Sequence, residues 1–462
     1  MSEGRSKPAA VDSGQCLDAL TDFICGTRLQ DVPDAVLADT GAIFADTLAV
    51  IAAGMQTAEM RALLPLHAPL AAPGAACVIG SGRRLNPLDA ASLNGTAGVF
   101  LELDAGNARS HGHPVIHCLP SALAIAQETG ASGADTLLAC VVGYEVCARV
   151  GGAAKMGIMV QPHGTYGVLG AAVAVAKLKG LSRPQVRTLI NVAAATPLGG
   201  NRQTMLDGAT VRNWYAGHSS HMGQMAVRLT EAGFTGPHAA LDVTFGKVLG
   251  TAFDSAQAID GLGRDWYAGE GYIKLYSGAR HLHSAIDALR DLWERHPGAS
   301  FTPDDVASID IRAHRLAAFC GEKVVPNAFG ARFSVPFAVA TVLAHRRWDL
   351  DCFNEAAVVN PVVRELMLKV DLREEPDFTR VYPEKQRCVL GVVLKNGTRL
   401  EGRCEIMRGE PENPNPPEAI EKKFFDLGTP VWGDALAARV YADSRRLTNV
   451  ANMRDFAGGA DL

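Results

Sequence analysis

The chain has 462 residues, of which 48% are hydrophobic and 6% aromatic, and its formal net charge is −5. A chain of this length exceeds what a single hydrophobic core usually supports, so we expect two domains. Few aromatic residues and many small ones favour closely packed helices. The weakly acidic balance gives no electrostatic field that would gather nucleic acid or an anionic membrane, which argues against both as partners.

The N-terminal segment, the apolar runs and the cysteines indicate the cellular compartment of the protein. Residues 1–15 are polar and lack the apolar centre of a signal peptide. No uncharged apolar run reaches about 18 residues, the length that a membrane span needs. Ten cysteines are scattered without a Cys-x-x-Cys pair, mostly among aliphatic residues. We therefore expect a soluble, cytoplasmic protein with reduced thiols.

The first part of the chain shows helical periodicity, with apolar residues three and four positions apart. This spacing predicts helices within residues 16–30, 34–54, 56–64, 115–129, 133–156, 168–178, 184–195 and 213–232. Residues 65–87 and 197–208 lack the pattern and are predicted to be irregular connections.

A glycine-broken loop, residues 94–114, lies between two of these apolar segments and collects ionisable side chains. It carries Glu102, Asp104, Arg109, His111 and His113. Loop residues can converge on a substrate while the neighbouring helices fix them, as acid/base chemistry requires. Taken alone, the composition fits a solvated polar loop equally well.

Two other features near the middle of the chain invite a functional interpretation. Tyr144, on the predicted helix 133–156, could face a site, although a buried tyrosine at a helix contact is commoner. Gly164-Thr165-Tyr166-Gly167 with Gly170 superficially resembles a dinucleotide-binding loop, but the preceding Val160-Gln161-Pro162-His163 cannot form the central strand that such a loop needs. We expect no nicotinamide cofactor, and instead a helix N-terminus that faces a pocket and favours an anion.

The pattern changes after residue 268. Residues 306–314 alternate as a strand does, and residues 388–394 and 399–407 flank Asn396-Gly397, a strong hairpin signal. Residues 333–343 predict an apolar helix between these strands.

The expected fold class is therefore α-dominated. A helical domain would comprise residues 1–268, rejoined by residues 410–462 after a proline-rich link, and a smaller α+β lid domain would comprise residues 269–409.

Several motifs in order resemble the MmgE/PrpD family over nearly the whole chain. The first half contributes Asp46-Thr47-Leu48, Asn94-Gly95-Thr96-Ala97, His113-Pro114, and Gly164-Thr165 with Gly167 and Gly170. The second half contributes Lys274 with His283, Ala331-Arg332-Phe333-Ser334-Val335-Pro336-Phe337, and Gly409-Glu410-Pro411-Glu412-Asn413-Pro414. The resemblance implies a helical domain with an α/β lid, a homodimer, and an active site between the domains that uses no metal or organic cofactor.

The chain also departs from the family pattern. Val160-Gln161-Pro162-His163-Gly164-Thr165 places the imidazole two positions later than Phe-His-Pro-Thr-Gly-Thr does, and Arg212 stands where the family often has lysine. The first of the usual acids is Glu102 rather than aspartate, and one residue is inserted before His113. The substrate therefore does not carry over from the resemblance.

The family's reactions share a carbanion-like centre next to a carboxylate, which requires cations and a base of near-neutral pKa. Arg212 offers a bidentate fork and Lys274 a point charge for a di- or tricarboxylate, unless the two form surface ion pairs. The expected catalytic residues are His113, His163, Lys274 and Tyr144. The expected substrate-binding residues are Glu102, Asp104, Gln161, Arg202, Gln203, Arg212, Tyr215 and His283.

A metal site is the alternative for the histidines. His111, His113 and His117, together with His281 and His283, have spacings that ligands can adopt, yet no cysteine or aspartate-rich motif accompanies them. We expect no metal.

The combined prediction is a cofactor-independent lyase that adds or removes water on a small polycarboxylate, with His113 as the principal acid/base. An epimerase or isomerase is the main alternative, which Gln161 in place of the usual histidine makes more credible, and a decarboxylase is a further one. A non-catalytic carboxylate-binding protein is the remaining alternative.

Overall fold

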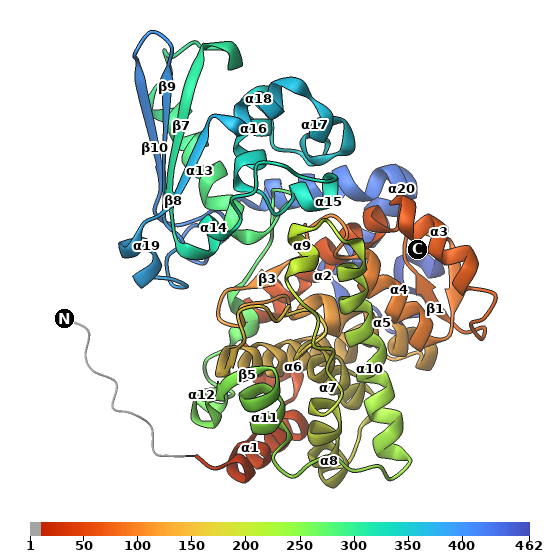
Figure 1. The fold of residues 1–462 in the computed structure, drawn as a ribbon. Helices are drawn as coiled ribbons and strands as arrows, with labels where there is room; N and C mark the ends of the chain where they lie inside the picture. The colour runs from red at the N-terminus through yellow and green to blue at the C-terminus, as the bar shows by residue number, and fades with distance from the viewer. Residues whose placement is uncertain (1–10) are drawn as a thin grey trace.

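The computed structural model describes residues 11–462, so the first ten residues of the polar N-terminal segment lie outside it. Two hydrophobic cores organise the described chain. One is built from residues 16–273 together with residues 424–462, and the other from residues 276–407. We call the corresponding parts the helical body and the sheet body (Figure 1). The predicted class, mostly helical with a smaller region that contains a sheet, is confirmed.

The helical body consists of helices that pack around α7. Its helices are α1 (Ser13–Gly26), α2 (Asp34–Met55), α3 (Ala58–His67), α4 (Pro87–Ala97), α5 (Val115–Thr129), α6 (Gly133–Ala153), α7 (Gly167–Lys179), α8 (Arg183–Ala194), α9 (Gln203–Leu206), α10 (Trp214–Glu231), α11 (Ala240–Val243), α12 (Ser255–Ile259) and α20 (Pro417–Arg445). Helices α5, α6 and α10 all contact α7, whose residues 167–176 are buried. Small side chains on α7 permit this close approach from three sides.

The helix predictions in this part are confirmed within a few residues at each end. Helix α5 begins and ends at the predicted residues. Its C-terminal end is set by Gly130, which adopts the left-handed conformation with φ of 76°. Gly180, with φ of 63°, ends α7 in the same way.

Short strands are the features that the sequence pattern did not reveal. The predicted connection at residues 65–87 contains an antiparallel pair, β1 (Ala76–Val78) and β2 (Arg83–Leu85). Two other pairs join distant segments: β3 (Gly106–Asn107) with β6 (Gly271–Tyr272), and β4 (Ala154–Met156) with β5 (Gly250–Phe253). Strands of two to four residues are too short to show a period of two.

The sheet body contains a four-stranded sheet in the order β10-β9-β7-β8. Its strands are β7 (Val306–Ala313), β8 (Val370–Glu374), β9 (Cys388–Leu394) and β10 (Arg399–Cys404). The hairpin predicted at Asn396-Gly397 is confirmed, since β9 and β10 pair antiparallel and Gly397 has φ of 88°. Strand β8 instead runs parallel to β7 at the edge.

Helices cover this sheet and complete the second core. They are α13 (Arg280–Arg295), α14 (Arg315–Phe319), α15 (Ala328–Ala331), α16 (Val335–His345), α17 (Glu355–Val359), α18 (Pro361–Leu368) and α19 (Pro376–Arg380). Helix α13 packs on β9 and β10, and α16 packs on α13. Helix α15 contacts α9 of the helical body, which brings the two bodies together beside the central loop (Figure 1).

Two helices, α2 and α6, are long and apolar enough to cross a membrane. Of their most apolar windows, 72% and 89% respectively are buried inside the protein. Helices α2 and α6 thus behave as core helices of the folded chain.

Helix α20 packs along α2 and bends at Gly433, where φ is 71°.

Candidate active site

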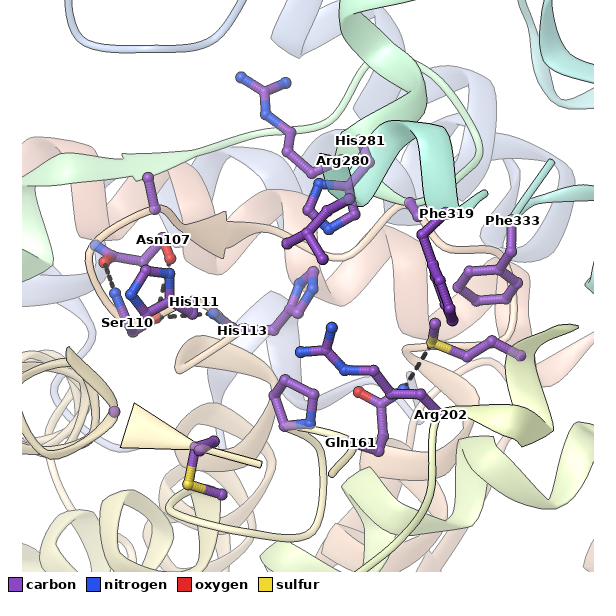
Figure 2. A pocket seen from close by; sticks show the side chains of 18 of the residues that line it. Asn107, Ser110, His111, His113, Gln161, Arg202, Arg280, His281, Phe319 and Phe333 are labelled. Carbon is purple, nitrogen blue, oxygen red and sulfur yellow. Dashed lines mark hydrogen bonds between the residues drawn. The ribbon is translucent and has the colours of Figure 1, made fainter. Parts of the chain in front are cut away.

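A cavity of about 310 Å³ lies between the two bodies, next to the central loop (Figure 2). The helical body contributes polar lining from the loop and from two irregular links. These residues include Glu102, Asn107, His111, His113, Gln161, Arg202 and Arg212. The sheet body contributes the opposite wall, with Arg280, His281, Phe319, Phe333 and Tyr382. The cavity lies between the two parts of the chain, where the family resemblance implied an active site, and its role as that site stays a prediction.

Distant segments hold the central loop by its backbone. The carbonyl groups of residues 100–103 each accept a hydrogen bond, at distances from 2.7 to 3.2 Å. The donors, in that order, are Arg332, Ser277, Lys274 together with the Gly278 amide, and Lys423. Buried backbone groups in a loop need such partners, and these fix the loop against both bodies.

The clamped loop contains unusual backbone conformations. Glu102 has φ of 50° and His111 has φ of 52°, values that non-glycine residues adopt uncommonly. Such conformations persist where the surroundings determine them, and they gather at functional sites. Both residues line the cavity.

Asp104 and His113 form the charged centre of the site. Nδ1 of His113 lies 2.8 Å from Oδ2 of Asp104, and Nζ of Lys274 lies 3.5 Å from Oδ1. Asp104 and Lys274 are fully buried, whereas the His113 side chain is 15% exposed. Burial alone would raise the pKa of Asp104, but His113 and Lys274 hold that pKa well below its usual range. Asp104 is therefore ionised, and Nε2 of His113 remains for a substrate.

His163 stacks on His113 in spite of its shifted position in the sequence. The ring centroids are 4.9 Å apart at an interplanar angle of 20°, and His117 meets His163 edge-on at 5.2 Å. His163 is buried and does not line the cavity. Burial, with Arg212 nearby, lowers the pKa of His163 well below its usual value, and burial lowers that of His117 to about 3. Both rings are neutral: His163 packs on His113, and His117 packs on His163, so neither is the exposed base.

Glu102 compensates the two cations that were expected to bind substrate. One of its carboxylate oxygens pairs with Arg212, and the other lies 3.5 Å from Nζ of Lys274. All three side chains are buried, so the surface ion pairs considered from the sequence do not apply. Lys274 does not line the cavity but lies behind the two acids.

Arg202 is the contrasting cation. It lies on the link before α9, lines the cavity together with Gln161, and donates from Nε to the carbonyl of Val160 at 3.1 Å. Within residues 11–462, no carboxylate forms an ion pair with it. Its positive charge faces the cavity without a protein counterion.

Seven predicted site residues lie outside the cavity lining: Asp104, His163 and Lys274, described above, and Tyr144, Gln203, Tyr215 and His283. Gln203 is exposed on α9, where its amide donates to Asp207 at 2.8 Å. Tyr144 is buried within α6, and burial raises the pKa of its hydroxyl. The direct roles predicted for these two side chains do not fit their positions. Gln203 faces solvent on α9, and Tyr144 faces the protein core on α6.

Tyr215 and His283 are also displaced from the cavity. Tyr215 is buried on α10 and packs against Gly164 and Gly200. His283 is buried on α13, with Nδ1 3.2 Å from a nitrogen of Arg280. Both support the site from behind rather than contact its contents.

The sequence did not identify the wall that the sheet body supplies. Arg280 lines the cavity but is paired with Glu410 at 2.6 Å and lies over the ring of Tyr272 at 4.2 Å. His281 had been considered only as a metal ligand, and Tyr382 carried no signal. Residues this far from the loop in sequence reach it through the fold, which local periodicity cannot predict.

Asp104, His113 and His163 also group as metal ligands could. One ligand atom from each lies within 4.8 Å of the others. This group differs from the set of histidines considered from the sequence, which comprised His111, His113, His117, His281 and His283. A divalent cation here would lie beside the Lys274 ammonium, 3.5 Å from Asp104, and charge repulsion would oppose its binding.

Known families match both parts of the chain. The MmgE/PrpD N-terminal domain matches residues 18–257, and the MmgE/PrpD C-terminal domain matches residues 276–445. The chain belongs to the MmgE/PrpD family, as the sequence motifs predicted.

Several similar proteins have cis-aconitate decarboxylase in their names. A cis-aconitate decarboxylase of Aspergillus terreus is 24% identical over 432 residues, which cover 88% of this chain and 87% of the relative. Cis-aconitate decarboxylase of Homo sapiens is 27% identical over 366 residues, covering 74% and 72%. The cis-aconitate decarboxylase-like protein oryM of Aspergillus oryzae is 24% identical over 478 residues, covering 96% and 94%.

Proposed function

We propose that the protein is a cofactor-independent lyase that moves a proton at a carbon next to a carboxylate of a small di- or tricarboxylate. Hydration or dehydration is the first reaction, as the sequence suggested. Decarboxylation is the second candidate, because relatives that cover most of the chain are named cis-aconitate decarboxylases.

The observation that carries this proposal is the Asp104–His113 pair at the cavity wall. Nδ1 of His113 lies 2.8 Å from Oδ2 of Asp104 and 3.3 Å from the Ala105 carbonyl, so both oxygens favour a proton on Nδ1 and leave Nε2 as an acceptor in the neutral form. When Nε2 takes a proton from the substrate, ionised Asp104 stabilises the imidazolium that forms. The same group then returns the proton, as a general acid, to the product or to the leaving group.

The surrounding charges suit an anionic intermediate. Arg212 and Lys274 lie with Glu102 in a buried, pre-formed cluster beside the loop. Fixed charges in a site that excludes water stabilise developing negative charge without reorganising. Phe319 and Phe333 supply apolar surface on the opposite wall.

The test is a substrate panel followed by NMR in deuterated water. Citrate, cis-aconitate, tartrate and aspartate cover the relevant classes of acid. A lyase of the first kind interconverts a hydroxy acid and an alkene without loss of carbon, whereas a decarboxylase releases carbon dioxide and incorporates one deuteron. Binding of these acids without any turnover would contradict the enzymatic proposal and support a carboxylate-binding protein.

A further inference from the structure

We propose that Arg202, His281 and Tyr382 form a second subsite in the cavity, which binds a carboxylate of the substrate other than the one next to the carbon that reacts at His113. This inference rests on the proposed function and narrows it: the substrate would carry at least two carboxylates, of which this subsite holds one.

The charge balance of the cavity is the first support. Arg212 is paired with Glu102, Arg280 with Glu410, and Lys274 lies near two acids. Arg202 has no carboxylate partner among the residues that the structure describes. Lys155, the other lining cation without an ion pair there, is exposed, so water solvates its charge.

A partly buried guanidinium without a counterion is costly, and an anionic ligand removes that cost. The Nε of Arg202 is held by the carbonyl of Val160, which leaves its terminal nitrogens for a ligand. Its planar fork matches the two oxygens of a carboxylate. Figure 2 shows this side chain extending into the cavity near His113.

The sheet body presents two uncharged polar groups to the same space. Nδ1 of His281 is buried and has no hydrogen-bond partner within residues 11–462. Burial, with His314 and Arg202 nearby, holds the pKa of His281 well below its usual value. Burial raises the pKa of Tyr382 to about 12, against the opposing charge of Arg202. Both groups are therefore neutral and able to donate a hydrogen bond to an anion.

Packing fixes these two groups in place. The rings of His281 and Tyr382 have centroids 6.1 Å apart, and both pack on the buried ring of His314, at 5.4 and 4.8 Å. Glu384 is a nearby acid, whose negative charge favours a higher pKa of His111, but it forms no ion pair with Arg202. One free cation and two rigid neutral donors are the chemistry that recognises a carboxylate.

The experiment uses propane-1,2,3-tricarboxylate, which has no hydroxyl group or double bond and stays unreacted. Calorimetry would compare the full chain with R202Q, H281F and Y382F. We expect R202Q to weaken binding at least about ten-fold, the usual effect of losing a hydrogen bond to a charged group. The ring-preserving variants H281F and Y382F should each weaken it by a smaller factor. R109Q is the matched control, since Arg109 is half-exposed, pairs with Glu270 and lies outside the cavity lining.

Affinity of R202Q within two-fold of the wild type would overturn the subsite, and so would a wild type that does not bind the tricarboxylate. If R202Q does not fold, H281F and Y382F decide, because both keep the aromatic packing on His314; unchanged affinity in both would also overturn it. An enzyme that turns over an acid while all three variants bind normally leaves the proposed function standing without the subsite.

Discussion

Replacing Asp104 with Asn tests how the buried carboxylate prepares His113. The substitution keeps the shape of the side chain but removes its charge, 2.8 Å from Nδ1 of His113. We expect turnover to fall because the imidazolium that forms during proton transfer loses its anionic partner, and because an amide can orient the ring in the wrong tautomer.

The magnitude follows from the geometry. Two unit charges 2.8 Å apart interact by about 6 kcal/mol at an effective dielectric constant of about 20. A hydrogen bond from the remaining amide offsets about 1–2 kcal/mol of this. The difference of about 4 kcal/mol corresponds to a loss of about 10³-fold in turnover, since each 1.4 kcal/mol changes a rate about ten-fold.

The assay is turnover of the acid found in the substrate panel, measured at saturating substrate for the wild type and Asp104→Asn. Thermal unfolding of both proteins corrects for any loss of folded molecules. Asp287→Asn is a matched control. Asp287 is also a buried carboxylate, but it lies in the sheet body, where it accepts hydrogen bonds from the Tyr276 hydroxyl and the Arg408 backbone amide. Asp104→Asn with more than about a tenth of normal turnover would refute the role given to Asp104.

Three further predictions concern stability, assembly and motion. Burial lowers the pKa of His117 to about 3 in the folded protein, whereas the unfolded chain has a histidine pKa of about 6.5. The unfolded chain therefore binds more protons between these pH values, and the free energy of unfolding falls as the pH drops below about 6.5. In urea unfolding, His117→Asn should reduce the slope of this free energy against pH by up to about 1.4 kcal/mol per pH unit, whereas the control His238→Gln, at an exposed histidine, should leave the slope unchanged; a slope equal to that of the wild type in His117→Asn would contradict the prediction. We expect a homodimer, because Val211, Trp214 and Phe234 leave apolar surface exposed on the helical body; light scattering that gives the single-chain mass of 48.8 kDa would exclude it. The two bodies should close on propane-1,2,3-tricarboxylate, since both line the cavity, and identical small-angle scattering curves with and without it would argue otherwise.

Elements with strong local signals were predictable from the sequence. Helix α5 combines helical spacing with a terminal glycine, and the hairpin of β9 and β10 has an Asn-Gly turn between alternating residues. These signals depend on neighbours within a few positions, so they hold before the chain folds. The short strands β3 and β6 depend on pairing between distant segments, which no local pattern records.

The site was predictable in its chemistry but not in its charge pairing. The loop acids and His113 stood together in the sequence, and the fold keeps them together. Which arginine remains free could not be inferred, because Glu102 could have paired with either Arg202 or Arg212 until the fold set their positions. His281 reaches the cavity from another body, through contacts between residues far apart in the chain.

The most direct test of the central claim is proton exchange at His113. The acid identified in the substrate panel is incubated in deuterated water with the wild type and with His113→Ala, and deuterium at the carbon next to the carboxylate is followed by NMR. We predict exchange or turnover by the wild type and a loss of about 10²- to 10⁴-fold in His113→Ala, the usual contribution of a general acid/base, with an unchanged melting temperature. Exchange at a near-normal rate in the folded variant would contradict the assignment of His113 as the group that moves the proton.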